Sequence, residues 1–165
     1  MKKGYLIQSL VLLIGTLFAW FTVYSDFSRF YNIYHSLTRV QNCIVPNPIT
    51  TPCFYGAFAF LGAFIWSLYI LRASNEKKIK HQKFLSIFLI GGTIFAWSNL
   101  AIEVYNFYIQ KMGPKVSCSG VAADNIFTTA CFIGSMIFLI SLITALAINR
   151  KIDLASLSGK GNQKK

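Results

Sequence analysis

One stretch of sequence decides the fold: residues 84–108 read FLSIFLIGGTIFAWSNLAIEVYNFY, with Glu103 as the single charged side chain. A run of about 20 apolar residues can cross the roughly 30 Å hydrocarbon core of a bilayer. Such a segment has to satisfy its backbone polar groups internally, so we expect it to be helical. Residues 84–108 therefore predict a transmembrane helix.

Three further apolar runs lie on either side of this one, at residues 5–24, 54–71 and 126–148. Of the 165 residues, 55% are hydrophobic and only 13% are charged, whereas globular proteins average roughly 25% charged residues. A small soluble domain exposes too much of its surface to conceal so many apolar side chains. The composition excludes a soluble enzyme, a disordered chain and a coiled coil, and it predicts an all-α, polytopic membrane four-helix bundle.

Basic residues predict the orientation of this bundle, because cytoplasmic loops are enriched in Lys and Arg. Two of the 16 basic residues precede the first run, five lie between the second and third runs, and five follow the fourth. We therefore predict a multi-pass protein of the cell membrane with both termini in the cytoplasm. The loops at about 25–53 and 109–125 then face outward. The net charge of +11 is explained by this topology, so the lipid bilayer is a predicted partner and nucleic acid is not.

The chain also repeats itself. Residues 15–20 (GTLFAW) match residues 92–97 (GTIFAW), and residues 50–56 (TTPCFYG) match residues 128–134 (TTACFIG). The two offsets are 77 and 78, so the matches are in register. We interpret the chain as a tandem repeat of two helical hairpins. The first run is then a retained helix and not a signal peptide, because its counterpart is internal.

This repeat sets the predicted domain organisation. A single membrane domain covers residues 1–152, with repeat 1 at about 5–72 and repeat 2 at about 84–150. Each repeat has two spans, so both copies insert the same way up, and a pseudo-twofold axis along the membrane normal is expected. We predict that residues 153–165 form a basic, disordered cytoplasmic tail.

Aromatic side chains predict that the first helix is longer than its apolar run. They step by three and four residues, which is helical spacing, at positions 20, 24, 27, 31 and 34. We expect this helix to continue to about His35. The aromatic residues would then form a belt at the membrane surface.

Four cysteines lie in or beside the outward loops: Cys43, Cys53, Cys118 and Cys131. An oxidising compartment permits disulfides there. Four cysteines allow three connectivities, and the repeat favours the disulfides Cys43–Cys53 and Cys118–Cys131. Each of them would close a short ring, worth roughly 3 kcal/mol on the chain-entropy account.

These disulfides could be static or redox-active. Cys53 and Cys131 lie at the outer ends of the second and fourth spans, where a helix N-terminus stabilises a thiolate. That position suits a reactive cysteine, and it equally suits a structural one. The residues alone leave both interpretations open.

The topology and the cysteine placement resemble the bacterial disulfide-bond formation protein B family and the related vitamin K epoxide reductase-like proteins. Residues 131–135 (CFIGS) are similar to the start of the membrane helix that follows the quinone-side cysteines of that family. The resemblance implies electron transfer to a quinone and a thioredoxin-like partner. It places Cys53 and Cys131 nearest the quinone, with Cys43 and Cys118 as their more exposed partners. The chain departs from the family in having no Cys-x-x-Cys.

Polar side chains at membrane depth are a second set of candidates. Glu103 lies inside a predicted span, and Asp26 is its counterpart at an offset of 77. Asn99, Glu103 and Asn106 step by four and three residues, so they lie on one face of a helix. These residues could move protons beside a cysteine or quinone, bind a cation, or join helices by hydrogen bonds.

Three functions follow from these observations. The first is a membrane thiol–disulfide oxidoreductase that passes electrons between the outward cysteine pairs and a quinone. The second is a non-enzymatic four-span accessory or assembly subunit, which binds another membrane protein and has two static loop disulfides. The third is a small transporter or channel that uses Asp26 and Glu103. No metal site is predicted, because His35 and His81 lie on opposite sides of the membrane and the cysteines lack zinc-site spacing.

Overall fold

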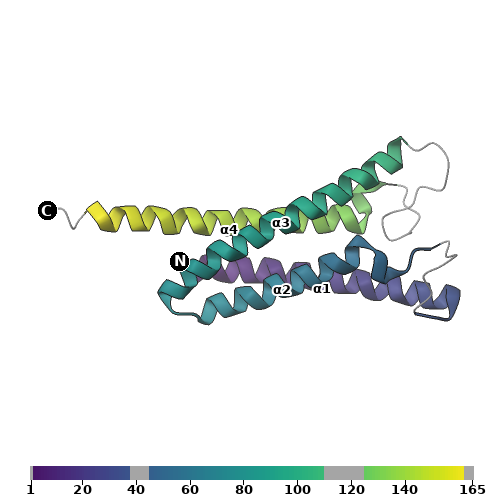
Figure 1. Ribbon diagram of the computed structural model, residues 1–165, viewed down its shortest axis with the longest axis horizontal. Helices are drawn as coiled ribbons and strands as arrows, with labels where there is room; N and C mark the ends of the chain where they lie inside the picture. The colour runs from purple at the N-terminus through teal and green to yellow at the C-terminus, as the bar shows by residue number, and fades with distance from the viewer. Residues whose placement is uncertain (1, 38–44, 110–124, 162–165) are drawn as a thin grey trace.

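The computed structural model describes residues 2–37, 45–109 and 125–161, with side chains as far as residue 155. Long helices make up most of this part of the chain (Figure 1): α1 (Lys2–Tyr34), α2 (Pro52–Arg72), α3 (Asn75–Tyr108) and α4 (Ala130–Gly161). All four are long and apolar enough to cross a membrane. The structure therefore confirms an all-α, four-helix fold that is compatible with a bilayer.

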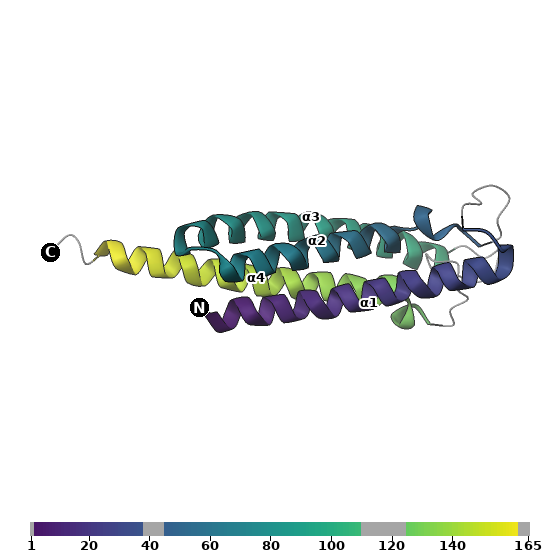
Figure 2. The ribbon, with the colours of Figure 1, turned by 90° about the horizontal axis from the view of Figure 1, so that it is seen from below.

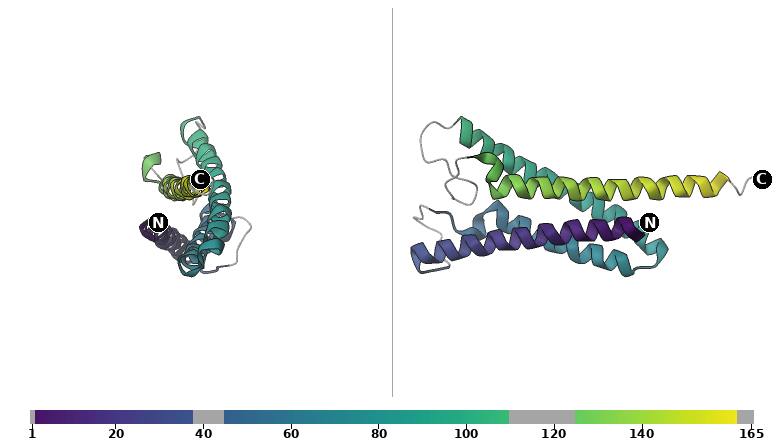
Figure 3. Two further views of the ribbon diagram at one scale, coloured as in Figure 1. Left: turned by 90° about the vertical axis from the view of Figure 1, so that its left-hand side faces the viewer. Right: turned by 180° about the vertical axis from the view of Figure 1, so that it is seen from behind.

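The helices form an antiparallel bundle (Figures 1 and 2). Along the chain each helix packs against the next, and α4 closes the bundle by packing against α1. At one end lie the start of α1, the α2–α3 turn and the end of α4, and we call this the basic end. At the other, which we call the cysteine end, α1 and α3 stop and α2 and α4 begin. Figure 3 shows the same arrangement along the bundle axis and from behind.

Several helix boundaries differ from the apolar runs, and α3 begins at Asn75, well before the run that starts at position 84. α1 continues to Tyr34, which confirms the extension predicted from the aromatic spacing. α4 begins at Ala130 and not at position 126, because a short 3-10 helix occupies the residues before it. The helical backbone of α4 then runs to Gly161, through a segment for which the sequence predicts a disordered tail.

Two matching turns set the starts of α2 and α4. A 3-10 helix precedes each of them, η1 (Pro48–Thr50) and η2 (Ile126–Thr128). At the first residue of each turn, the side-chain oxygen of Asn47 or Asn125 accepts the backbone N–H two residues on, at 3.0 Å in both cases. The hydroxyl of a threonine three residues later donates to the backbone carbonyl of the same asparagine, at 2.7 Å and 2.8 Å. The asparagine side chains thus cap the two 3-10 helices in the same way.

Two phenylalanines meet in the middle of the bundle. The rings of Phe60 on α2 and Phe138 on α4 have centroids 3.9 Å apart and planes inclined by 32°. Glycines on the neighbouring helices make room for them. A Cβ atom on Gly15 would lie 2.5 Å from the Phe60 ring, and one on Gly92 would lie 2.6 Å from the Phe138 ring. α1 and α3 therefore approach these rings in the same way.

A polar layer separates this aromatic centre from the basic end. The Gln82 side-chain amide donates to the side-chain carbonyl of Gln8 at 2.9 Å, and both residues are buried. A serine pair joins α1 to α2 at 3.0 Å. An asparagine–serine bond joins α4 to α3 at 2.8 Å. Such bonds between helices hold membrane bundles together where water is excluded.

Candidate functional site

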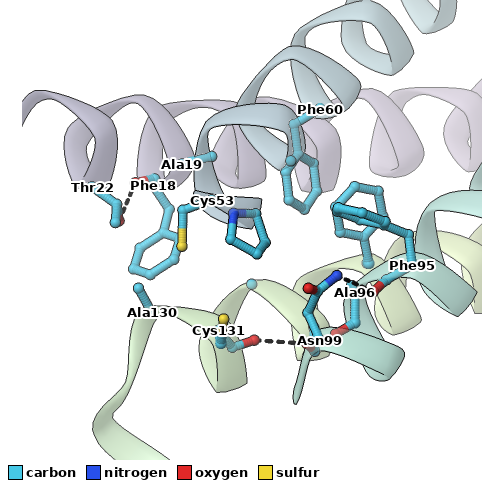
Figure 4. Close-up of a pocket in the computed structure, with 15 residues that line it drawn as sticks. Phe18, Ala19, Thr22, Cys53, Phe60, Phe95, Ala96, Asn99, Ala130 and Cys131 are labelled. Atoms are coloured by element: carbon cyan, nitrogen blue, oxygen red, sulfur yellow. Dashed lines mark hydrogen bonds between the residues drawn. The ribbon is translucent and has the colours of Figure 1, made fainter. Parts of the chain in front are cut away.

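A cavity of about 60 Å³ lies between the two hairpins, toward the cysteine end (Figure 4). All four helices contribute to its lining, which is largely apolar and includes the rings of Phe18, Phe60, Phe95 and Phe138. One water needs roughly 10–15 Å³ of such space, whereas pockets for drug-sized ligands reach roughly 300–1,000 Å³. The cavity therefore has room for a few waters and is smaller than the roughly 150 Å³ of an engineered apolar cavity that binds benzene.

Cys53 and Cys131 both line this cavity. Each is the second residue of its helix, and Figure 4 shows their sulfur atoms on the two sides of the same space. Cys131 is disulfide-bonded. Cys43 and Cys118, the predicted partners, lie outside the described residues, so the two pairings stay predictions.

The lining residues are related by the same sequence offsets on which the predicted repeat rests. Fourteen of its fifteen residues form seven pairs, at an offset of 77 for α1 with α3 and 78 for α2 with α4. The pairs are Phe18/Phe95, Ala19/Ala96, Thr22/Asn99, Pro52/Ala130, Cys53/Cys131, Gly56/Gly134 and Phe60/Phe138. Ser135 is the remaining lining residue, and Ala57 stands at its counterpart position.

The two acids lie beside the cavity, and both are buried. Asp26 is 4% exposed and Glu103 is 5% exposed. An Arg29 guanidinium nitrogen lies 2.9 Å from an Asp26 carboxylate oxygen. Both carboxylates are within electrostatic range of the Cys53 thiol. The structure therefore brings these two residues, which are far apart in sequence, to one cysteine.

The asparagines of α3 are divided between the interior and the surface. Asn99 lines the cavity, one helical turn from the buried Glu103. Asn106 is exposed, so it does not join them at the site. A role for any of these three residues stays a prediction.

Sequence reasoning missed part of the site. It did not single out Thr22, the phenylalanines of the lining or the two turn asparagines. Their signal is present in the sequence, because applying the repeat offset to every position pairs Thr22 with Asn99 and Phe60 with Phe138.

The chain matches no known protein family, no curated protein and no solved structure. The resemblance to disulfide-bond formation proteins therefore has no family match behind it. The part that the structure supports is the set of four long apolar helices that are compatible with a membrane.

Proposed function

We propose that the protein is a membrane thiol–disulfide oxidoreductase that passes electrons between outward-facing cysteines and a quinone. One observation carries the proposal: Cys53 and Cys131, 78 positions apart, line the same apolar cavity. A bound quinone supplies an acceptor for two electrons and two protons, while one dithiol becomes one disulfide. The largely apolar lining, with its four phenylalanine rings, supports a flat ring as the bound group.

The residues of the chain have separate roles in this proposal. Cys53 and Cys131 carry the electrons at the cavity. Cys43 and Cys118 exchange disulfides with a thioredoxin-like partner. Asp26 and Glu103 both lie within electrostatic range of the Cys53 thiol and pass on the proton that this thiol gives up.

We also propose that the fold is a tandem repeat of two hairpins about a pseudo-twofold axis. Three matched pairs of features support this symmetry. They are the two asparagine turns before α2 and α4, the two glycine–phenylalanine contacts, and the seven residue pairs of the cavity lining. The cavity would then lie on the axis, with equivalent groups facing it from both hairpins.

For the orientation, we propose that the basic end faces the cytoplasm and the cysteine end faces outward. Among the lysines and arginines that the structure describes, Arg29 alone lies toward the cysteine end. This distribution supports the rule that cytoplasmic loops are basic. An outward cysteine end would also meet an oxidising compartment.

Thiol trapping in native membranes tests the enzyme proposal. Mass-shift alkylation would be applied before mild reduction, after it, and after a quinone is added. We expect the quinone to restore the oxidised pattern in the wild-type protein, and the variants Cys53→Ser and Cys131→Ser to lose this response. The matching hydroquinone is the control, because it cannot accept electrons.

One observation favours a second candidate, a non-enzymatic subunit with static disulfides: Cys131 is disulfide-bonded. The same experiment separates the two functions. If every cysteine stays oxidised until the protein is denatured, the oxidoreductase proposal is wrong. The bridges then serve only to shape the loops, and the partner to seek is another membrane protein.

A further inference from the structure

Three polar side chains of the cavity each donate a hydrogen bond to a backbone carbonyl one helical turn back. Thr22 donates its hydroxyl hydrogen to the backbone carbonyl of Phe18 at 3.0 Å. Asn99 donates an amide hydrogen to the carbonyl of Phe95 at 2.8 Å. Ser135 likewise donates to a carbonyl one turn back, at 2.7 Å. Bonds of this kind are common for hydroxyl side chains in helices.

The consequence is that the cavity presents oxygen atoms that can accept hydrogen bonds. A carbonyl can only accept, so the amide nitrogen of Asn99 must face Phe95, and its oxygen is turned away from that carbonyl (Figure 4). The hydroxyl oxygen of Thr22 keeps its lone pairs. Thr22 and Asn99 are a pair at the repeat offset, and Figure 4 shows them on opposite sides of the cavity.

We propose that this cavity selects a flat ring with hydrogen-bond donors at opposite ends, and so binds a hydroquinone more tightly than the corresponding quinone. The inference rests on the proposed function and deepens it. A hydroquinone hydroxyl can donate to Thr22 without disturbing the bond to Phe18. A quinone carbonyl needs the Thr22 hydrogen and has to break that bond. Asn99 has a second N–H and an acceptor oxygen, so it can form a hydrogen bond with either the quinone or the hydroquinone.

This preference has a redox consequence. A site that binds the reduced form more tightly makes the bound acceptor easier to reduce. For a two-electron couple, a tenfold ratio of dissociation constants corresponds to about 30 mV. The cavity would therefore favour electron flow from the cysteine thiols to the ring.

Direct binding tests the inference without relying on turnover. The full chain in detergent would be equilibrated, without oxygen, with a short-chain ubiquinone or with its hydroquinone, and the two dissociation constants compared. The comparison would be repeated in the double variant Cys53→Ser/Cys131→Ser, which cannot exchange electrons with the ligand. One net hydrogen bond changes an equilibrium about two- to tenfold, so we expect the hydroquinone to bind at least threefold more tightly.

Variants assign the preference to Thr22. Thr22→Val keeps the shape of the side chain and removes the acceptor, so the ratio should fall toward one, while Thr22→Ser should retain it. Thr93→Val is the matched control, because Thr93 also donates to a carbonyl one turn back, at 2.7 Å, but does not line the cavity. Thermal unfolding of each variant checks that the bundle is intact.

Each outcome has a distinct meaning. If the two forms bind equally, or the quinone binds more tightly, the inference is overturned and the oxidoreductase proposal survives. The same holds if Thr93→Val shifts the ratio as much as Thr22→Val. If neither form binds, the proposed function itself fails.

Discussion

Asn47 and Asn125 make the same turn in very different surroundings. Asn47 is 3% exposed, and its amide nitrogen also donates to the backbone carbonyl of Leu37 at 3.1 Å. Asn125 is exposed, so water can replace the bonds of its side chain. A buried polar group that loses its partner costs about 1–3 kcal/mol, whereas an exposed one costs much less.

We therefore expect Asn47→Ala to destabilise the protein by about 1–3 kcal/mol and Asn125→Ala by less than about 1 kcal/mol. Removing Asn47 leaves both the Ile49 N–H and the Leu37 carbonyl without their side-chain partner. Equilibrium unfolding in mixed detergent micelles would measure both variants. Equal losses would mean that burial does not distinguish the two turns.

At the scale of helices, α3 packs tightly against α4 at one of two adjacent glycines. Gly92 faces the Phe138 ring, while its neighbour Gly91 has no atom within 4 Å of the position of an added Cβ. Phe138 is 3% exposed and stacks on Phe60, so its ring cannot retreat freely. Two adjacent glycines thus give a matched pair of sites.

Gly92→Ala should destabilise the bundle by about 1–3 kcal/mol, because the added methyl group overpacks a filled core. Gly91→Ala should be neutral or should stabilise α3 by up to about 1 kcal/mol, because alanine has the higher helix propensity. Thermal unfolding of the two variants in detergent would make the comparison. A stable Gly92→Ala protein would show that the Phe60–Phe138 pair can shift.

Gln8 and Gln82 connect helices that lie diagonally across the bundle. Their bond joins the Gln82 amide nitrogen to the Gln8 carbonyl oxygen. The other two polar atoms, the Gln8 nitrogen and the Gln82 oxygen, have no hydrogen-bond partner within the described residues. Gln82→Leu alone should cost about 1–3 kcal/mol, because it leaves the buried amide of Gln8 unsatisfied. Adding Gln8→Leu should recover most of that loss. A double variant as unstable as the sum of the single changes would show that the pair is not coupled.

At the scale of the whole molecule, the cysteine end and the basic end are proposed to lie on opposite sides of the membrane. This orientation predicts which positions a reagent outside intact cells can reach. In a background without native cysteines, Thr50→Cys at the cysteine end should react with a membrane-impermeant alkylating reagent added to intact cells. Ser74→Cys, in the α2–α3 turn, should react only after the cells are permeabilised. Both positions are exposed, so access to the reagent decides the result. The reverse pattern would overturn the proposed orientation.

The sequence by itself determined that four helices form and roughly where they lie. Apolar length fixes this because an isolated segment in lipid must bond its own backbone, and the result did not depend on any contact between helices. The aromatic spacing similarly extended α1 to Tyr34. The start of α4 was placed too early, because the capped turn at Asn125 interrupts an apolar run that looks continuous.

Only the tertiary structure decided that Cys53 and Cys131 share a cavity. The sequence assigned each cysteine to its own loop and hairpin, and an offset between repeats contains no distance. The meeting depends on how α1–α2 packs against α3–α4. The Phe60–Phe138 contact forms part of the cavity wall, and Gly15 and Gly92 leave room for the two rings. Packing of this kind is set by side-chain shape across helices, and a linear pattern does not specify it.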